Sequence, residues 1–192
     1  VEESLYAEKE KAYLQNDFYA PPLFREALRH HSAEVVRVPH LNGDVSGDAL
    51  RRFQPDVIVL DGSRIEKLHI FTEARLGAMN AHPGLLPEFR GVDSVRWAIF
   101  YGKPVGATCH FVDSGIDTGP ILLRREVSYK IGEKLLEIRV RVMCVCAELM
   151  AEAVQGLSNG SVKPIPQPQE GGYYSWAPPE VLSRVDVILS GV

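Results

Sequence analysis

The sequence has few cysteines, no long apolar run and no excess of positive charge. Its 192 residues include three cysteines, and an odd number without the spacing of secreted proteins excludes a disulfide framework and indicates a reducing compartment, the cytoplasm. No apolar run approaches the roughly 20 residues that a membrane-spanning helix needs. The formal net charge of -4 provides no global field to attract phosphodiesters, which argues against a dedicated nucleic-acid-binding module.

The cysteines also give no reason to expect a metal. Cys144 and Cys146 are two residues apart in a segment with helical periodicity, so their side chains point roughly 200° apart around a helix. A tetrahedral zinc site needs ligands that converge on one point. We therefore expect no metal in this protein.

The remaining composition is that of an ordinary globular protein. Hydrophobic residues make up 45% and charged residues 24% of the chain, which excludes collagen-like, coiled-coil and largely disordered chains. No internal repeat or second domain is visible. We expect one domain over residues 1–162 and an extended C-terminal tail over residues 163–192, because the tail begins with a segment rich in proline, glutamine and glycine.

The order of the predicted elements indicates an α/β fold. The apolar run at residues 56–60 is typical of a strand buried on both faces of a parallel sheet. Apolar residues at helical spacing predict a long helix over residues 133–157, packed on the sheet. The other expected helices cover residues 4–15, 23–30, 48–53, 70–75 and 93–101, and the other strands cover residues 34–38, 76–80, 105–112 and 119–127. This order predicts a mostly parallel sheet flanked by helices.

Polar residues at the carboxyl end of the strand at 76–80 form the candidate site. Asn80 and His82 are two residues apart in an extended segment, so their side chains project to the same side. Asp117 lies on a glycine-bounded loop that can approach the imidazole and either hold one tautomer or favour its protonated form. This trio has no nucleophile and suits acyl transfer to an amine of the substrate. Asn80 would donate to the oxyanion, while His82 and Asp117 would handle protons.

Several neighbouring residues have two interpretations. His110 alternates with apolar residues and is interpreted as a sheet histidine with its hydrogen bonds satisfied. Asp113 is interpreted as a turn former, with a second acidic partner as the alternative. Arg90 either contacts an anionic part of a substrate or holds its loop through a carboxylate pair. Tyr173 and Tyr174 either contact an acceptor or pack the tail on the core.

Two separated motifs resemble the folate-dependent formyltransferases. The first is Asn-Ala-His-Pro-Gly-Leu-Leu-Pro at residues 80–87, followed by Arg90-Gly91, and the second is Asp-Ser-Gly-Ile-Asp-Thr-Gly-Pro-Ile at residues 113–121. The family includes glycinamide ribonucleotide formyltransferase, methionyl-tRNA formyltransferase and the sugar N-formyltransferases. The resemblance covers roughly residues 55 to 157.

The resemblance implies a Rossmann-like sheet, N10-formyltetrahydrofolate as formyl donor, and Asn80, His82 and Asp117 as the catalytic trio. We take Arg90 and Gly91 as candidates for binding the acceptor. The folate-binding residues that the resemblance implies lie at a strand end and in both motifs: Leu60, Gly62, Ser63, Arg64, Ile65, Leu85, Leu86, Pro87, Gly115 and Ile116.

The expected activity is therefore transfer of a formyl group from this folate to a primary amine. We favour a small-molecule acceptor such as an amino sugar, because the basic surface expected of a methionyl-tRNA enzyme and the Gly-rich phosphate loop expected of a glycinamide ribonucleotide enzyme are both missing. Two alternatives stay open: a hydrolase that releases formate from the same folate, and a non-catalytic remnant that binds folate or a partner protein.

Two features depart from the family pattern. Relatives open with a strand, a helix and a strand before anything like Val1, so we expect that upstream residues or a second chain complete the sheet, and a homo-oligomer stays open. Asp61 stands where relatives commonly have a small or aromatic residue. Its carboxylate either lies beside the folate site or caps the end of the strand.

Overall fold

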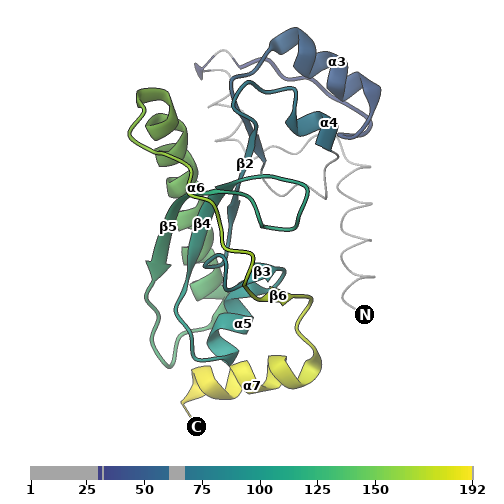
Figure 1. Ribbon diagram of the computed structural model, residues 1–192. Coiled ribbons are helices and arrows are strands. Elements are labelled where there is room, and N and C mark those ends of the chain that lie inside the picture. Colours follow the sequence, from purple (N-terminus) through teal and green to yellow (C-terminus); the bar gives the residue numbers. More distant parts are fainter. Residues whose placement is uncertain (1–29, 32, 61–67, 192) are drawn as a thin grey trace. The chain divides into compact units, whose positions relative to one another are not determined.

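A computed structural model describes residues 30–31, 33–60 and 68–191 (Figure 1). The chain divides into two compact units, Val1–Arg37 and Val38–Val192, and the elements discussed below belong to the second. The predicted helix at residues 4–15 lies outside the described residues. The predicted helix at residues 23–30 also lies outside them, except for residue 30.

A four-stranded sheet in the order β1-β2-β4-β5 forms the centre of the second unit. Its strands are β1 (Ile58–Leu60), β2 (Ala78–His82), β4 (Val105–Phe111) and β5 (Ile121–Val127). The α/β fold is confirmed, but the prediction of a mostly parallel sheet is wrong for the described strands. Within the four-stranded sheet only the β1–β2 pair is parallel, while β4 runs antiparallel to both β2 and β5. The short loop between β4 and β5 explains part of this, because so short a connection can only join antiparallel strands.

Helices cover the sheet and its ends. They are α3 (Asp44–Phe53), α4 (Leu68–Phe71), α5 (Ser94–Phe100), α6 (Leu135–Asn159) and α7 (Pro179–Ser190). The long helix α6 packs against β2, β4 and β5, as the sequence predicted (Figure 1). Its buried side is a stripe at helical spacing: Ile138, Val142, Cys146, Leu149 and Ala153.

Three local predictions need correction. The residues at 34–38 form no strand; Val35 and Val36 are 50% and 46% exposed, so this apolar run is not buried in a sheet. Helix α3 begins at Asp44 and not at residue 48; Ser46 lies in its first turn, and the Ser46 hydroxyl donates to the His40 carbonyl before the helix. Strand β2 ends two residues later than predicted, which brings His82 into the sheet.

The C-terminal region is more ordered than an extended tail. Strand β6 (Tyr173–Tyr174) pairs with β3 (Arg90–Gly91), and α7 packs against α5 (Figure 1). Residues 179–190 thus correct the prediction of an extended tail over 163–192. Proline at the first turn and Gly191 after the last are helix boundary signals. Between them, Val181, Val185 and Leu189 recur every four residues and are buried.

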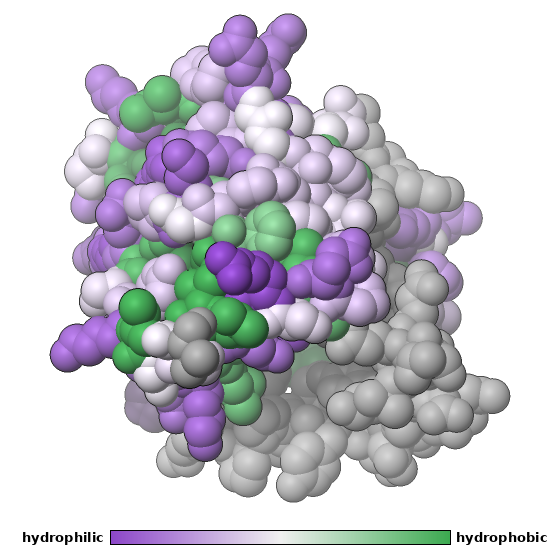
Figure 2. All heavy atoms as spheres, turned by 90° about the horizontal axis from the view of Figure 1, so that it is seen from below, coloured by the Kyte–Doolittle hydropathy of each residue, from purple (hydrophilic) through white to green (hydrophobic). Residues whose placement is uncertain are grey.

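Seen from the side that carries α7, apolar side chains lie among polar ones (Figure 2); the exposed apolar residues of this region include Ile131, Trp176 and Val187. Cys109, Cys144 and Cys146, all within the described residues, form no disulfide with one another. Within the described ranges, no helix has the length and apolar character to cross a membrane, and no group of three or more potential ligands could hold a metal.

Candidate functional site

The register between β2 and β4 gathers polar side chains on one face of the sheet. Asn80 lies opposite His110, and His82 lies opposite Thr108. Residues directly opposite on neighbouring strands share a face, as do residues two apart on one strand. The intervening Ala81 packs against the apolar core on the side of α6. One face of these strands is thus polar and the other apolar.

His82 is held by two hydrogen-bonding groups in the protein interior. Its Nε2 lies 2.7 Å from the Phe89 carbonyl oxygen and 3.0 Å from the Ser94 hydroxyl. Because a carbonyl only accepts, Nε2 carries the proton, and Nδ1 faces the Asp117 carboxylate at 3.5 Å. Burial lowers the pKa of the His82 imidazole, and the nearby Asp117 charge opposes this only in part.

Asp117 reaches this face from the loop between β4 and β5. One carboxylate oxygen accepts from the Gly91 backbone N–H at 2.8 Å and lies 3.5 Å from His82 Nδ1. Burial alone would raise the pKa of the Asp117 carboxyl. The interactions with His110, His82 and the Gly91 N–H together outweigh burial, so the pKa is lowered and the carboxylate is the favoured form.

His110 is the neighbour that the sequence interpretation missed. It is 2% exposed, and its Nδ1 donates to the Phe111 carbonyl at 2.7 Å. Its Nε2 has no hydrogen-bond partner among the described residues and lies 3.6 Å from the second Asp117 oxygen. The prediction of a fully satisfied sheet histidine is therefore wrong. The direction of the His110 side chain follows from the β2–β4 register, which places His110 opposite Asn80 on the same face of the sheet.

Hydrogen bonds fix the loops of the two motifs, one from within its motif and the other from Thr108 on β4. The Asp113 carboxylate accepts from the Gly115 N–H and the Thr118 hydroxyl, which confirms its turn-forming role. The Thr108 hydroxyl donates to the Gly84 carbonyl and accepts from the Leu86 N–H. These bonds shape both loops beside His82 without using any of the three predicted catalytic side chains.

The predicted folate-binding residues lie in different settings. Leu85 and Leu86 are 2% and 0% exposed, so their side chains pack in the interior. Ile116 is 45% exposed, Gly115 is also exposed, and Pro87 is half-buried. Leu60 lines an apolar groove between the β1–β2 strands and α6. Asp61 and the predicted residues Gly62, Ser63, Arg64 and Ile65 lie outside the described residues.

Arg90 and Gly91, the predicted acceptor-binding residues, contact other parts of the chain. Arg90 is buried, and its guanidinium donates to the backbone carbonyls of Pro168 and Gln169 and to the Gln167 side chain. This holds the loop, but through neutral oxygens and not through the carboxylate pair considered above. Gly91 has a φ of 93°, and a Cβ there would lie 2.1 Å from the Tyr174 carbonyl oxygen. Only glycine fits this position.

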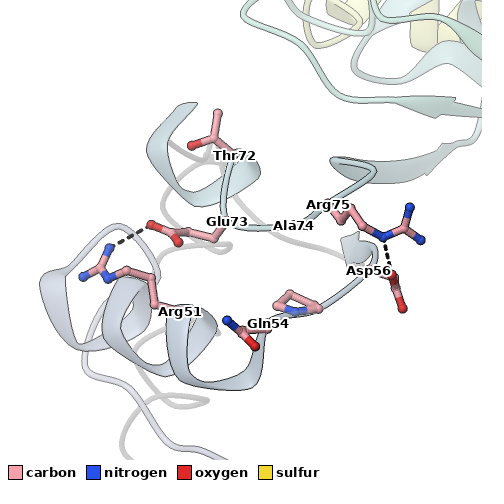
Figure 3. Close-up of a pocket in the computed structure, with 8 residues that line it drawn as sticks. Arg51, Gln54, Asp56, Thr72, Glu73, Ala74 and Arg75 are labelled. Carbon is pink, nitrogen blue, oxygen red and sulfur yellow. Dashed lines mark hydrogen bonds and ion pairs between the residues drawn. The ribbon is translucent and has the colours of Figure 1, made fainter.

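A separate pocket lies between α3 and the segment after α4 (Figure 3). Its charged groups are already paired: Arg51 contacts Glu73 at 2.7 Å, and Arg75 contacts Asp56 at 2.6 Å. None of the predicted catalytic or folate-binding residues lines it. The pocket is therefore distinct from the face that carries His82.

Comparison with known proteins identifies the family. A formyl transferase family model matches residues 16–154. Methionyl-tRNA formyltransferase from Pelobacter propionicus is 31% identical over 160 residues, which cover 82% of this chain and 50% of the relative. The same enzyme from Myxococcus xanthus is 30% identical over 158 residues, with 81% and 50% covered. The chain thus spans about half the length of the curated relatives it matches.

Solved structures with the same fold include enzymes with different acceptors. The formyltransferase PseJ from Anoxybacillus kamchatkensis, crystallised with UDP-4,6-dideoxy-4-formamido-L-AltNAc and tetrahydrofolate, matches with a TM-score of 0.65 and 26% identity over 82% of both chains. Glycinamide ribonucleotide transformylase 1 from Symbiobacterium toebii matches with a TM-score of 0.64 and 25% identity over 76% of both. The matches agree with the two motifs beside His82 and Asp117, and this chain belongs to the formyl transferase family.

Proposed function

We propose that this chain transfers a formyl group from N10-formyltetrahydrofolate to a primary amine, with Asn80, His82 and Asp117 as the catalytic residues. The observation that carries the proposal is the His82–Asp117 pair: a carboxylate 3.5 Å from a buried imidazole, reached from a separate motif. Asn80 lies on the same face of β2, where its amide can donate to an oxyanion.

The reaction needs no protein nucleophile. The amine nitrogen attacks the formyl carbon, a C–N bond forms, and the carbonyl oxygen becomes an oxyanion to which Asn80 donates. The amine nitrogen, now positively charged, loses a proton to the His82–Asp117 pair. The bond from the formyl carbon to the folate N10 then breaks, and N10 takes up a proton from the same pair. Asp117 is the more accessible member, because its side chain is 14% exposed against 4% for His82.

The residues around Asp117 fit a folate donor. Exposed Ile116 offers apolar surface next to the half-buried Asp117 carboxylate, while the Gly115 N–H beside them donates to Asp113. A pterin needs this combination of apolar contact and a few well-placed polar groups. The folate would supply the activated formyl group, and this chain's residues would orient it. PseJ, which matches this chain over most of its length, was crystallised with tetrahydrofolate.

We favour a small-molecule amine as acceptor and the cytoplasm as the compartment. The acidic chain, with its net charge of -4, gives no general attraction to a tRNA backbone. PseJ was crystallised with a formamido sugar nucleotide, whereas the curated relatives named above are methionyl-tRNA enzymes. The cysteines, which form no disulfide with one another, are the basis for the cytoplasmic assignment.

One assay tests this function against its alternatives. The chain is incubated with N10-formyltetrahydrofolate, with and without a panel of amino sugars, amino-sugar nucleotides, glycinamide ribonucleotide and methionyl-tRNA, while tetrahydrofolate release is followed. Release that depends on a small amine supports the proposal, and release that depends on methionyl-tRNA overturns the acceptor class. Release without any amine indicates a hydrolase. Folate binding without release indicates a non-catalytic remnant.

A further inference from the structure

We propose that Gln167, in the segment after α6, is a positioning residue that holds Asp117 within reach of His82. The inference rests on the proposed function for its effect on turnover, and on the described contacts for its geometry. Gln167 lies 50 residues beyond Asp117 in the chain. No motif in the sequence points to it.

The Gln167 amide contacts the catalytic loop on both sides of Thr118. Its Nε2 donates to the Asp117 carbonyl at 3.0 Å and to the Gly119 carbonyl at 2.6 Å. Both protons of the amide are therefore used on the loop that carries the catalytic carboxylate. Two hydrogen bonds from one planar amide fix the position and orientation of the backbone from Asp117 to Gly119.

Arg90 determines which end of the amide faces the loop. Its Nη2 donates to Gln167 Oε1 at 3.1 Å, and a guanidinium cannot accept. The Oε1 end is thus fixed on Arg90, and the Nε2 end must face the two carbonyls. Arg90 is itself held by the carbonyls of Pro168 and Gln169. The buried, charged guanidinium of Arg90 therefore sets the orientation of the Gln167 side-chain amide.

Asp117 needs support from outside its own loop. Its φ is 54°, in the left-handed region that a non-glycine residue keeps only where its surroundings hold it there. The Asp113 hydrogen bonds close the loop around Gly115 and Thr118 but do not reach Asp117. Gly91 holds the carboxylate, and Gln167 holds the backbone of the same residue.

The alternative is that Gln167 only attaches the C-terminal region to the sheet through Arg90. Gln167→Glu separates the two roles, because glutamate keeps the oxygen that accepts from Arg90 and adds a charge that favours this contact. It replaces the Nε2 donor with an oxygen that faces two carbonyl oxygens. The variant therefore retains the Arg90 attachment and loses the hold on Asp117.

The experiment measures kcat, KM and Tm for Gln167→Glu and Gln167→Ala. The matched control is Gln169→Glu, the same substitution at an exposed side chain in the same segment, whose backbone carbonyl is unchanged. We expect both Gln167 variants to lower kcat by about 10- to 100-fold, since small displacements of a catalytic group have effects of this size. KM and Tm of Gln167→Glu should stay close to those of the wild-type chain.

The pH profile of Gln167→Glu adds a test that simple attachment would not affect. A protonated glutamic acid can donate one hydrogen bond to the loop, so the ratio of variant to wild-type kcat should rise as the pH falls. Unchanged kcat in Gln167→Glu, or a loss of kcat matched by an equal loss in Gln169→Glu, would overturn the proposal.

If the wild-type chain transfers no formyl group, the proposed function fails. A second measurement then still tests whether Gln167 positions Asp117. NMR titration of the His82 ring nitrogens reports the Asp117 charge directly, because that charge raises the pKa of His82. A lower titration midpoint in Gln167→Ala, with an unchanged midpoint in the control, supports the positioning role. An unchanged midpoint in Gln167→Ala contradicts it.

Discussion

The two motifs of the site are held in place in different ways. His82 lies on β2, where sheet register and two hydrogen-bonding neighbours fix its ring. Asp117 lies on a loop, and the contacts that hold it come from Gly91 and Gln167, both remote in sequence. A residue on a strand can thus be positioned by its sheet register and by groups close to it in sequence. One on a loop depends on distant parts of the chain.

The largest effect is expected from replacing either member of the pair. His82→Asn and Asp117→Asn should each lower kcat by about 10²–10⁴, the usual contribution of a positioned proton-transfer group. Steady-state formyl transfer with a responsive amine provides the measurement, and folate affinity should change little. A loss of less than tenfold for either variant would show that the pair is not the proton-transfer centre.

Gly91→Ala should disrupt the backbone that donates a hydrogen bond to the Asp117 carboxylate. Its Cβ would lie 2.1 Å from the Tyr174 carbonyl oxygen, at a φ of 93°, so β3 and β6 must separate. We expect a loss of about 3 kcal/mol in unfolding free energy, in line with other strained backbone positions, measured by chemical denaturation. Gly102→Ala is the control, because it also has a positive φ but no atom within 4 Å of the added Cβ. Equal losses in the two variants would mean that strain alone, and not the β3–β6 contact, sets the effect.

Asp113→Ala tests the internal support of the same loop. It removes the acceptor for the Gly115 N–H and the Thr118 hydroxyl. These two bonds should together contribute about 1–3 kcal/mol. Urea denaturation gives the loss, and a smaller loss in Asp113→Asn, which keeps an acceptor oxygen, would sharpen the assignment. No change in Asp113→Ala would show that contacts outside the loop suffice to hold it.

The smallest expected effect is on the pH dependence of the unfolding free energy, through His82 on β2. The folded pKa of His82 lies below its ordinary value of 6.5, mainly because of burial. The unfolded chain therefore binds the proton more readily, so this contribution to stability is complete above pH 6.5 and is lost as the pH falls through the folded pKa. His82→Asn should remove that part of the slope in unfolding free energy below pH 6.5. An unchanged slope would contradict the burial of a neutral imidazole.

The contrast between His82 on a strand and Asp117 on a loop also explains which parts of the site the sequence could predict. The spacing of Asn80 and His82 in an extended segment placed both side chains on one face, and this is a local property of a strand. The four strands of the central sheet, the long helix α6 and the turn at Asp113 followed from similar local signals. The antiparallel direction of β4 did not, because strand direction depends on how the chain returns to the sheet.

The missed parts of the site depend on contacts between distant segments. His110 faces Asp117 because β4 pairs with β2 in a register that places it opposite Asn80, and Gln167 reaches the loop because the C-terminal region packs beside β3. Neither contact leaves a pattern in the neighbouring sequence. Arg90 was selected for its charge, and its burial against three oxygens of the C-terminal region could not be inferred from residues 80–91.

A double-variant measurement tests the central claim that His82 and Asp117 act as one unit. The kcat of His82→Asn/Asp117→Asn is compared with that of each single variant. Residues that act together are strongly non-additive, so the double variant should lose about as much activity as the more damaging single variant. A loss equal to the product of the two single losses would show that the imidazole and the carboxylate act independently, and would contradict the account.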